Sequence, residues 1–387
     1  MSRNISMVIN TSGLAYDDRL RKECGSLARL GARPSILALE RANRESSGRT
    51  DEDIPFKTIT LATRGLLPHR GGLGIKLAEM YGLFATRILH QRPEVLWVHD
   101  PEMAGLVPFG AMLRRLGVIQ RLVWDQHELP PQTVLSRPTT KRILTGMMLS
   151  CDAVVVANNE RRDLLTETLG SALKSRFQVL DNFSDDRFNE LVSSGPPPEL
   201  TTWLAERPYL LAQGGANPKR HLASLVEAVL RLDDVALVVV GPFQEDERQQ
   251  LAHRFGPAFE QRVRFEGLVP QMELVNFIDT ALASIVLYDH DQPNSNLCAP
   301  NRLYQALSRG TPGVVGCNPP MARVVSEFGC GVVLEGDGRD PSDLQRSLAT
   351  FLASSTIFKA AAQANRRAFR WENQDTAVSA AAGLDGP

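Results

Sequence analysis

Short apolar runs alternate with amphipathic stretches along the first half of the chain. The runs are rich in Val, Ile and Leu and predict β-strands at 5–10, 34–39, 95–99, 122–125, 153–157 and 178–180. Between them, apolar residues recur with helical spacing at 17–30, 102–116, 139–149 and 158–169. Continuous apolar strands that alternate with helices are typical of a parallel sheet covered on both faces. We therefore predict a doubly wound α/β domain.

The same alternation returns in the second half, after an interruption. Residues 182–208 contain a Ser-Ser-Gly-Pro-Pro-Pro run and predict a linker with one short helix. Predicted strands then follow at 209–213, 235–241, 263–266, 283–288, 313–316 and 331–334, with helices at 219–231, 244–255, 271–281, 300–309, 319–328 and 341–353. The expected fold class is thus α/β, with two doubly wound parallel-sheet (Rossmann-like) domains.

Composition agrees with two ordinary globular domains. The chain has 387 residues, of which 43% are hydrophobic and 22% charged, and its net charge is −1. That balance lacks the concentrated positive charge of a nucleic-acid-binding protein. The five scattered cysteines form no Cys-x-x-Cys pair, so neither structural zinc nor a disulfide framework is indicated. No run approaches the roughly 18 apolar residues of a membrane span, and we expect a cytoplasmic protein.

Ligands of doubly wound sheets bind outside the carboxyl ends of the strands, so the residues that follow strands are candidates. After the first strand, Gly13 lies in a loop before a helix, where backbone N–H groups can approach an anion. The alternative is a plain strand-to-helix turn with Asp17 as the helix N-cap.

Two clusters of histidine and carboxylate residues follow neighbouring strands. They are His99-Asp100-Pro101-Glu102 and Asp125-Gln126-His127-Glu128. Imidazole and carboxylate groups are suited to hydrogen bonding of sugar hydroxyls or to proton transfer. The alternative is that Asp100 caps the next helix and Glu128 is merely solvated.

The second domain opens with a glycine-rich turn followed by basic residues. Gly214 and Gly215 directly follow a strand, and Lys219 and Arg220 stand where the next helix begins. Small residues admit a phosphate close to the backbone, and a guanidinium fork matches phosphate oxygens. The pattern favours a diphosphate site, with Lys219 facing solvent more than Arg220. It lacks the Walker spacing, so ATPase chemistry is not indicated.

A long polar loop leaves the strand at 283–288 and enters a helix that we expect to begin at Pro300 and to end at Gly310. The free N–H groups and positive dipole end of such a helix favour an anion.

Several motifs resemble one family. They are Asp18-Arg19-Leu20-Arg21-Lys22-Glu23 followed by Leu27-Ala28-Arg29-Leu30-Gly31, Trp124-Asp125-Gln126-His127-Glu128-Leu129, Asp181-Asn182, Arg220 with Leu225-Val226-Glu227-Ala228, Asn301-Arg302-Leu303-Tyr304-Gln305-Ala306-Leu307 with Gly310-Thr311-Pro312, and Phe369-Arg370-Trp371-Glu372. Over nearly its whole length the chain resembles the GT-B glycosyltransferases, in particular the retaining family 4 (glycosyl transferases group 1).

The resemblance implies two domains facing across a cleft, divided as 1–185 (acceptor side), 200–368 (nucleotide-sugar binding) and 369–387 (a terminal helix returning to the first domain). It implies transfer of a sugar, with retention, from a nucleotide-diphosphate sugar to a glycan, lipid-linked or small-molecule acceptor. Neither a metal nor a cofactor is implied, because helix dipoles and basic side chains stabilise the departing diphosphate.

The site residues carried over by resemblance and by position fall into three groups. The catalytic candidates are His127 and Arg220. The donor-binding candidates are Gly13, Gly214, Gly215, Lys219, Arg220, Cys298, Ala299, Pro300, Arg302 and Gln305. The acceptor-side candidates are Asp100, Glu102 and Glu128.

Three positions depart from the family pattern. Gln305 stands where members usually have a glutamate at the ribose, Gly215 where many have an arginine, and Leu297 where many have a second glutamate. A catalytically inactive GT-B protein that binds nucleotide-sugars or regulates is therefore an alternative to an enzyme. A nucleotide-sugar epimerase using His290 and Asp291 is a third.

The segment 64–92 mixes apolar residues with arginine and lysine, within a half of the chain (1–190) whose net charge is +4. It is suited to peripheral contact with the inner face of a membrane. The alternative is an ordinary helix with one face toward the core.

Overall fold

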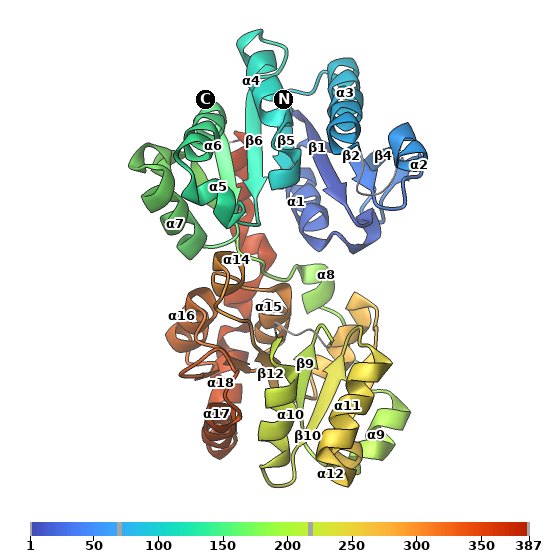
Figure 1. Ribbon diagram of the computed structural model, residues 1–387, viewed down its shortest axis with the longest axis vertical. Helices are drawn as coiled ribbons and strands as arrows, with labels where there is room; N and C mark the ends of the chain where they lie inside the picture. Colours follow the sequence, from blue (N-terminus) through green and yellow to red (C-terminus); the bar gives the residue numbers. More distant parts are fainter. Residues whose placement is uncertain (1, 68–71, 216–219, 385–387) are drawn as a thin grey trace. The chain divides into compact units, whose positions relative to one another are not determined.

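The computed structural model describes residues 2–67, 72–215 and 220–384. Contacts divide the chain into two units (Figure 1). The first contains Met1–Asp181 together with Gln374–Pro387, and the second contains Asn182–Asn373. Each unit is an α/β domain built on its own parallel sheet, as the sequence predicts.

The sheet of the first unit has eight strands in the order β3-β4-β2-β1-β5-β6-β7-β8, all parallel except β3, which runs antiparallel to β4. The strands are β1 (Asn4–Thr11), β2 (Arg33–Glu40), β3 (Ser47–Arg49), β4 (Pro55–Ile59), β5 (Val95–His99), β6 (Arg121–Gln126), β7 (Ala153–Val156) and β8 (Phe177–Val179). All five residues of β5 are buried, because helices cover both faces of the sheet.

The helices of the first unit are α1 (Asp18–Arg29), α2 (Ala62–Leu66), α3 (Leu73–Gln91), α4 (Leu106–Arg115), α5 (Gln132–Ser136), α6 (Pro138–Ser150), α7 (Asn159–Leu169) and α19 (Asp375–Ala382), with 3₁₀ turns η1 (Leu14–Tyr16), η2 (Pro101–Met103) and η3 (Ser171–Arg176). Asp17 does cap α1, since its side chain accepts from the Leu20 N–H at 3.2 Å.

The second unit holds a six-stranded, entirely parallel sheet in the order β11-β10-β9-β12-β13-β14. Its strands are β9 (Tyr209–Gln213), β10 (Ala236–Val240), β11 (Val263–Gly267), β12 (Ala283–Val286), β13 (Gly313–Val315) and β14 (Gly331–Val333). Its helices are α8 (Asp186–Asn189), α9 (Pro198–Leu204), α10 (Leu222–Leu230), α11 (Glu245–Phe255), α12 (Pro257–Arg262), α13 (Val275–Ile278), α14 (Pro293–Asn296), α15 (Asn301–Ser308), α16 (Pro319–Glu327), α17 (Pro341–Ala353) and α18 (Ser355–Asn365), with 3₁₀ turns η5 (Gln271–Leu274) and η6 (Arg366–Phe369). The turn η7 (Trp371–Gln374) leads back to the first unit.

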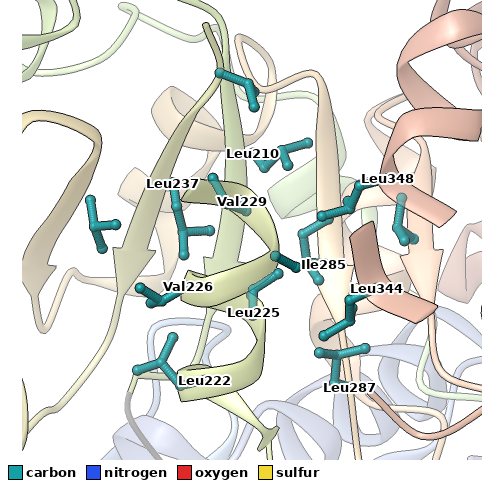
Figure 2. Close-up of a cluster of buried hydrophobic side chains, with 14 of the residues drawn as sticks. Leu210, Leu222, Leu225, Val226, Val229, Leu237, Ile285, Leu287, Leu344 and Leu348 are labelled. Atoms are coloured by element: carbon teal, nitrogen blue, oxygen red, sulfur yellow. The ribbon is translucent and has the colours of Figure 1, made fainter. Parts of the chain in front are cut away.

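The core of the second unit lies on both faces of its sheet. Leu210 of β9 packs on one face with Leu225 and Val226 of α10 and Leu348 of α17, as Figure 2 shows. Its neighbour Leu211 belongs to a separate cluster with α8, α9 and α13. Consecutive residues of a strand point to opposite faces, so both layers of helices are held by apolar burial.

Each sheet reverses its strand order at one place. In the first unit β1 pairs with both β2 and β5, and in the second unit β9 pairs with both β10 and β12. Ligands of open α/β sheets bind beside such a switch point, at the carboxyl ends of the strands. The topology therefore directs attention to the residues that follow β1, β5, β9 and β12.

The linker predicted at 182–208 belongs instead to the second unit. It forms two short helices, α8 and α9, because Phe188, Leu200 and Leu204 are buried in the core of that unit. Sequence reasoning also missed α12, α14, α18 and the edge strands β3 and β4, and it merged η5 and α13 into one helix. Apart from α18, which has 11 residues, these are short elements, in which periodicity carries little signal.

The end of the chain is shared between the two units. Residues 369–373 pack with the second unit, where the Trp371 N–H donates to the Ser184 carbonyl at 2.8 Å. The segment from Gln374 onward packs with the first unit. There Asp375 accepts from Ser26 at 2.6 Å, and Arg121 donates to the Ala381 carbonyl at 2.7 Å.

The segment proposed for membrane contact, 64–92, falls mainly on α3, whose Met80, Phe84 and Ile88 are buried. Residues 68–71 lie outside the described residues. Leu73 and Ile75 of α3 are exposed. In the described part of the chain, no helix has both the length and the apolar character that crossing a bilayer requires.

Candidate functional site

A buried group of charged residues lies where β5 and β6 of the first unit end. Arg19 of α1 donates from Nε to Asp125 Oδ2 at 3.0 Å and from Nη1 to the Leu180 carbonyl at 3.0 Å. Arg19 Nε also lies 3.2 Å from Glu23 Oε1. Burial favours the neutral form of Asp125, but Arg19 and His127 hold the pKa of its carboxyl well below the usual range. Asp125 is therefore a buried carboxylate with a cation beside it.

The pKa shifts of Glu23 and His99 favour the neutral form of each side chain, whereas the shift of Asp125 favours its charged form. Burial raises the pKa of the Glu23 carboxyl well above its usual range, and Asp125 nearby raises it further. Burial lowers the pKa of His99, whose Nε2 lies 3.7 Å from Glu23 Oε2 and whose Nδ1 lies 3.8 Å from Asp125 Oδ2. At neutral pH the interior part of this group thus holds one ion pair, Arg19 with Asp125, and two neutral partners.

His127 lies at the outer edge of this group, with carboxylates at both ring nitrogens. Its Nε2 lies 3.0 Å from Asp100 Oδ1, and its Nδ1 lies 3.5 Å from Asp125 Oδ1. Burial works against charge on the ring, but the hydrogen bonds to Asp100 and Asp125 raise the pKa of His127 to about 10. Arg161 of α7 donates to the His127 carbonyl. His127 is therefore an imidazolium with a fixed backbone and a fixed ring.

Capping of the next helix was the alternative to a functional role for Asp100, but its side chain does not cap the 3₁₀ turn η2 that follows it. It has φ 66°, makes no side-chain cap bond, and turns its carboxylate to His127. Glu102 accepts from Asn10 Nδ2 at 2.6 Å, and its carbonyl accepts from the Tyr81 hydroxyl at 2.9 Å. Glu128 is exposed, with no hydrogen bond or ion pair among the described residues.

The turn at Gly13 offers little to an external anion. The Gly13 N–H donates to Thr11 Oγ1 at 3.4 Å, and the Leu14 N–H donates to Glu40 Oε1 at 2.8 Å. The Thr11 hydroxyl and the Glu40 carboxylate thus already accept from the two N–H groups that a phosphate would use. The structure of this turn fits a plain strand-to-helix connection better than an anion-binding loop.

In the second unit, two arginines meet at the switch point between β9 and β12. Arg302 of α15 donates from Nη1 to the Gln213 carbonyl at 2.5 Å and from Nη2 to the Leu287 carbonyl at 3.3 Å. Arg220 donates to the Gly214 carbonyl. Both guanidinium groups lie over the ring of Tyr288, with Cζ 4.7 Å from its centroid for Arg302 and 6.0 Å for Arg220.

These two cations have no anionic partner in the part of the chain that the structure describes. No carboxylate oxygen there lies within 4.0 Å of either guanidinium, and the Nε atoms of both are buried without an acceptor. Burial lowers the pKa of Arg302 to about 10. The Gln213 side-chain amide beside them is also buried and unpartnered. A buried site with two cations and unfilled donors is suited to an anionic ligand with several oxygens.

The glycine turn contributes space rather than backbone donors. The N–H groups of Gly214 and Gly215 both donate to the Val240 carbonyl, at 2.7 and 2.9 Å, so neither points at a ligand. Both residues have positive φ, 95° and 70°. A Cβ on Gly215 would lie 1.9 Å from the Pro242 carbonyl oxygen. Gly215 therefore leaves no room for the arginine that many family members have there.

The backbone at 298–300 is likewise partly engaged. The Cys298 N–H donates to the Ser295 carbonyl at 3.2 Å, and the Ala299 carbonyl accepts from Asn182 Nδ2 at 3.0 Å. Pro300 is the N-cap of α15 rather than its first residue. Gln305, one turn into the helix beyond Arg302, is buried and its side-chain amide makes no hydrogen bond with the described residues. Lys219 lies outside the described residues.

One group of three potential metal ligands occurs in the described part of the chain: His99, Asp125 and His127, whose ligand atoms lie within 4.8 Å of one another. We assign no metal there, because the Arg19 guanidinium already donates to both oxygens of Asp125 and would repel a cation. An Asp-x-Asp spacing, which sequence reasoning overlooked, follows β12 at Asp289 and Asp291. Asp291 instead pairs with Arg339 at 2.6 Å.

Sequence reasoning also missed several partners at these sites. Arg19 and Glu23 belong to a stretch that resembles the family. Gln213 directly precedes the candidate Gly214, and Tyr288 ends the predicted strand before the polar loop. None of the four was expected to be a site residue. For Gln213 a signal exists, since it is a polar residue at the end of an otherwise apolar strand beside a switch point. Arg19 and Glu23 are separated from Asp125 by about a hundred residues, and only the fold brings them together.

Neither protein-family models nor curated protein sequences match this chain. Solved structures do. Sucrose-phosphate synthase from Thermosynechococcus elongatus superposes with a TM-score of 0.74 at 16% identity, covering 97% of each chain. An α,α-trehalose-phosphate synthase (UDP-forming) from Burkholderia xenovorans, in complex with glucose-6-phosphate, gives 0.71 at 14%, covering 96% of this chain and 98% of that one. HepE from Anabaena, in complex with UDP, gives 0.69 at 13%, covering 97% and 98%. The chain therefore has the GT-B fold.

The close packing at Gly215 predicts an unequal response to alanine. Gly215 and Gly117 both have φ 70°, but a Cβ at Gly117, which lies just beyond the end of α4, would meet no atom within 4 Å. We expect Gly117→Ala to lower the free energy of unfolding by about 1 kcal/mol, for the left-handed conformation alone. Gly215→Ala should add a further ~1–3 kcal/mol for the overlap with Pro242. Chemical denaturation measures both, and equal losses would contradict the packing argument.

The carboxylate contacts of His127 predict its titration. In ¹³C-histidine NMR, the wild-type ring should stay charged through neutral pH, and Asp100→Asn should lower its pKa. The folded pKa of about 10 exceeds the ordinary 6.5. The interaction therefore stabilises the fold fully below about pH 6.5 and is lost as pH rises to about 10. Asp337→Asn, which faces His221, is the control. Titration of wild-type His127 near 6.5 would refute the assignment.

Proposed function

We propose that this protein is a glycosyltransferase that takes a sugar from a nucleotide-diphosphate sugar bound by its second unit. The observation that carries the proposal is the pair Arg220 and Arg302 at the β9/β12 switch point, where no carboxylate of the described residues lies beside either guanidinium. Arg302 is buried and Arg220 beside it is half-buried, and two adjacent cations that are not neutralised are unfavourable there unless an anion binds them. A diphosphate offers the required charge and oxygens.

The chemistry of sugar transfer gives these cations a role in the reaction. When the bond from the sugar to the diphosphate breaks, negative charge grows on the leaving phosphate. Guanidinium groups fixed by backbone carbonyls need no rearrangement to stabilise that charge. The N–H groups of Asn301 and Arg302, in the first turn of α15, add the positive end of a helix dipole. In this arrangement Gln305 meets the nucleotide ribose, as the family resemblance implies.

Two of the similar structures have names that fit a donor of this kind. One trehalose-phosphate synthase is described as UDP-forming and has glucose-6-phosphate bound, and HepE has UDP bound. At 13–14% identity these likenesses concern the fold alone, and they supply only the chemical class of ligand to try first. The proposal for this chain depends on its own arginines.

The first unit supplies the acceptor side in this proposal. His127 is a cation that contacts the donor sugar, and Asp100, Glu102 and Glu128 line the acceptor's approach. We further propose, from the family 4 resemblance, that the sugar is transferred with retention and without a metal or other cofactor. The acceptor is a glycan, a lipid-linked sugar or a small molecule, and the protein acts in the cytoplasm or at the inner face of the membrane. No observation favours a nucleic acid as a partner or substrate.

A second candidate function is nucleotide-sugar binding without catalysis. It is favoured by the engagement of His127, since Asp100 and Asp125 face both ring nitrogens and leave neither open to a sugar hydroxyl. The epimerase alternative is weaker, because His290 lies against Cys317 and Asp291 pairs with Arg339. Incubating the protein with UDP-, GDP- and TDP-sugars distinguishes an enzyme, which releases the nucleotide diphosphate, from a binding protein, which does not.

The phosphate assignment predicts the effect of removing a guanidinium. Arg220→Ala should lower turnover by about 100-fold, as removal of one preorganised donor does, and should weaken UDP binding in calorimetry. Arg302 also holds two backbone carbonyls, so Arg302→Lys is the better test there; it keeps the charge but loses the fork. We expect the turnover of Arg302→Lys to lie between that of the wild type and that of Arg220→Ala.

The matched control is Arg254→Ala, because Arg254 is an exposed arginine of the same unit that pairs with Glu227. It should leave turnover and nucleotide affinity unchanged. If Arg220→Ala behaves like this control, the arginine pair does not bind the diphosphate and the proposed function fails. Nucleotide binding that depends on Arg220, without any transfer or hydrolysis, would support the second candidate.

Metal independence is tested directly. Donor hydrolysis or transfer should be the same with EDTA as with added magnesium or manganese, because the cations of the site belong to the protein. Activity that EDTA abolishes and manganese restores would contradict this part of the proposal. The first residues to examine would then be Asp289 and Asp291, with His99, Asp125 and His127 as the other group.

A further inference from the structure

A groove of about 550 Å³ opens on the surface of the first unit between α6 and the end of α7, two helices that Figure 1 shows side by side. It is lined by Pro138, Lys141, Arg142, Thr145, Leu149 and Leu169, among others. Its walls combine aliphatic side chains with the basic residues of α6.

The groove belongs to a surface with an excess of positive charge, which we call the α6 surface. It comprises Arg137, Lys141, Arg142, Ile143 and Leu149 on or beside α6, and Lys174 and Arg176 on η3, which packs against α6. The chain has no acidic residue between Glu128 and Asp152, and none in η3. The basic residues of this surface therefore lie on segments that contain no carboxylate.

None of these five basic side chains makes an ion pair or hydrogen bond with the described residues. The nearby acids are largely engaged, since Asp152 pairs with Arg114 and Asp163 pairs with Arg162. Glu167 of α7 is the exposed exception. Unneutralised basic groups on a surface attract an anionic partner.

Apolar side chains on the same helix face show what kind of anionic partner fits. Ile143 is 59% exposed and Leu149 is 39% exposed. They share the outer face of α6 with Arg142 and Gly146. Nucleic acids and acidic proteins require the charges but not the exposed aliphatic residues, whereas a bilayer interface uses both.

The helix α3, which the sequence pattern favours for membrane contact, differs in charge. It exposes Leu73 and Ile75, but its Arg87 lies 3.8 Å from Glu45, and its own Glu79 accepts from the Ala62 N–H at 2.8 Å. Its positive charge is thus partly neutralised within the unit. It serves as a control of similar apolarity and lower charge.

We propose that the α6 surface docks on an anionic lipid bilayer, with its five basic side chains among the headgroups and with Ile143 and Leu149 at the edge of the acyl region. This inference does not depend on the proposed function. A protein of any activity could be held at a membrane in this way. It does place the first unit, which carries the acceptor-side candidates, against lipid.

The test is sedimentation of the full chain with vesicles of phosphatidylcholine, alone or mixed with phosphatidylglycerol, at low and high salt. The wild type should bind the anionic vesicles at low salt and lose binding at high salt. Lys141→Gln with Arg142→Gln should weaken the partition coefficient by about 25-fold, that is, about fivefold for each basic group removed. Ile143→Ser with Leu149→Ser should weaken it by about tenfold or more.

The matched control is Lys76→Gln with Arg87→Gln, which removes the same charge from α3. It should bind like the wild type, and circular dichroism checks that every variant is folded. Absence of wild-type binding to anionic vesicles overturns the proposal, and so does loss in the α3 variant with none in the α6 variant. A third outcome would also overturn the proposal. If Lys141→Gln with Arg142→Gln weakens binding to heparin and to vesicles equally, and Ile143→Ser with Leu149→Ser weakens neither, the surface is a general polyanion site.

Discussion

Parallel pairing of the strands is the constraint on which the rest of this structure depends. Parallel strands carry all their carboxyl ends to one edge, and reversal of the strand order beside β1 and beside β9 opens that edge between neighbouring loops. The residues that follow β5 and β6, and those that follow β9 and β12, are far apart in the chain but are brought together by this one rule. Every candidate site residue that the structure brings into a cluster lies at such an edge.

The carboxyl-end edges of the two sheets compensate the charges of their polar side chains in different ways. In the first unit, Arg19, Asp125, Asp100 and His127 neutralise one another, and burial favours the uncharged forms of Glu23 and His99. The charges of that edge are therefore balanced within the protein, although the side chains of Glu23 and His99 are buried without a hydrogen bond to the described residues. In the second unit, carbonyl oxygens and an aromatic ring hold Arg220 and Arg302, and no carboxylate of the described residues does. This contrast in charge is the physical basis for proposing that the anionic ligand binds to the second unit.

The departures from the family pattern also have different physical meanings. Gly215 is imposed by the packing of the turn on Pro242, since its backbone conformation and surroundings exclude any side chain. The neighbouring Arg302 reaches the same carbonyl-rich turn from α15, so positive charge is present although it comes from another element. Gln305 has no such explanation in the structure. The residue is 5% exposed, and its side-chain amide makes no hydrogen bond with the described residues.

The sequence by itself determined the two α/β domains and nearly all the strands of both sheets. It also offered the capping of α1 by Asp17 as one of two alternatives, and it named His127, Arg220 and Arg302 as candidate site residues. It did so because strand and helix periodicities and turn residues are local signals. It could not show that Arg19 and Glu23 lie beneath Asp125, that both ring nitrogens of His127 face carboxylates, or that the N–H groups of Gly214 and Gly215 are taken by β10. Nor could it show that 182–208 packs as part of the second unit. These are contacts between distant segments, and only the tertiary structure decides them, because burial and pairing partners depend on which elements the sheet makes neighbours.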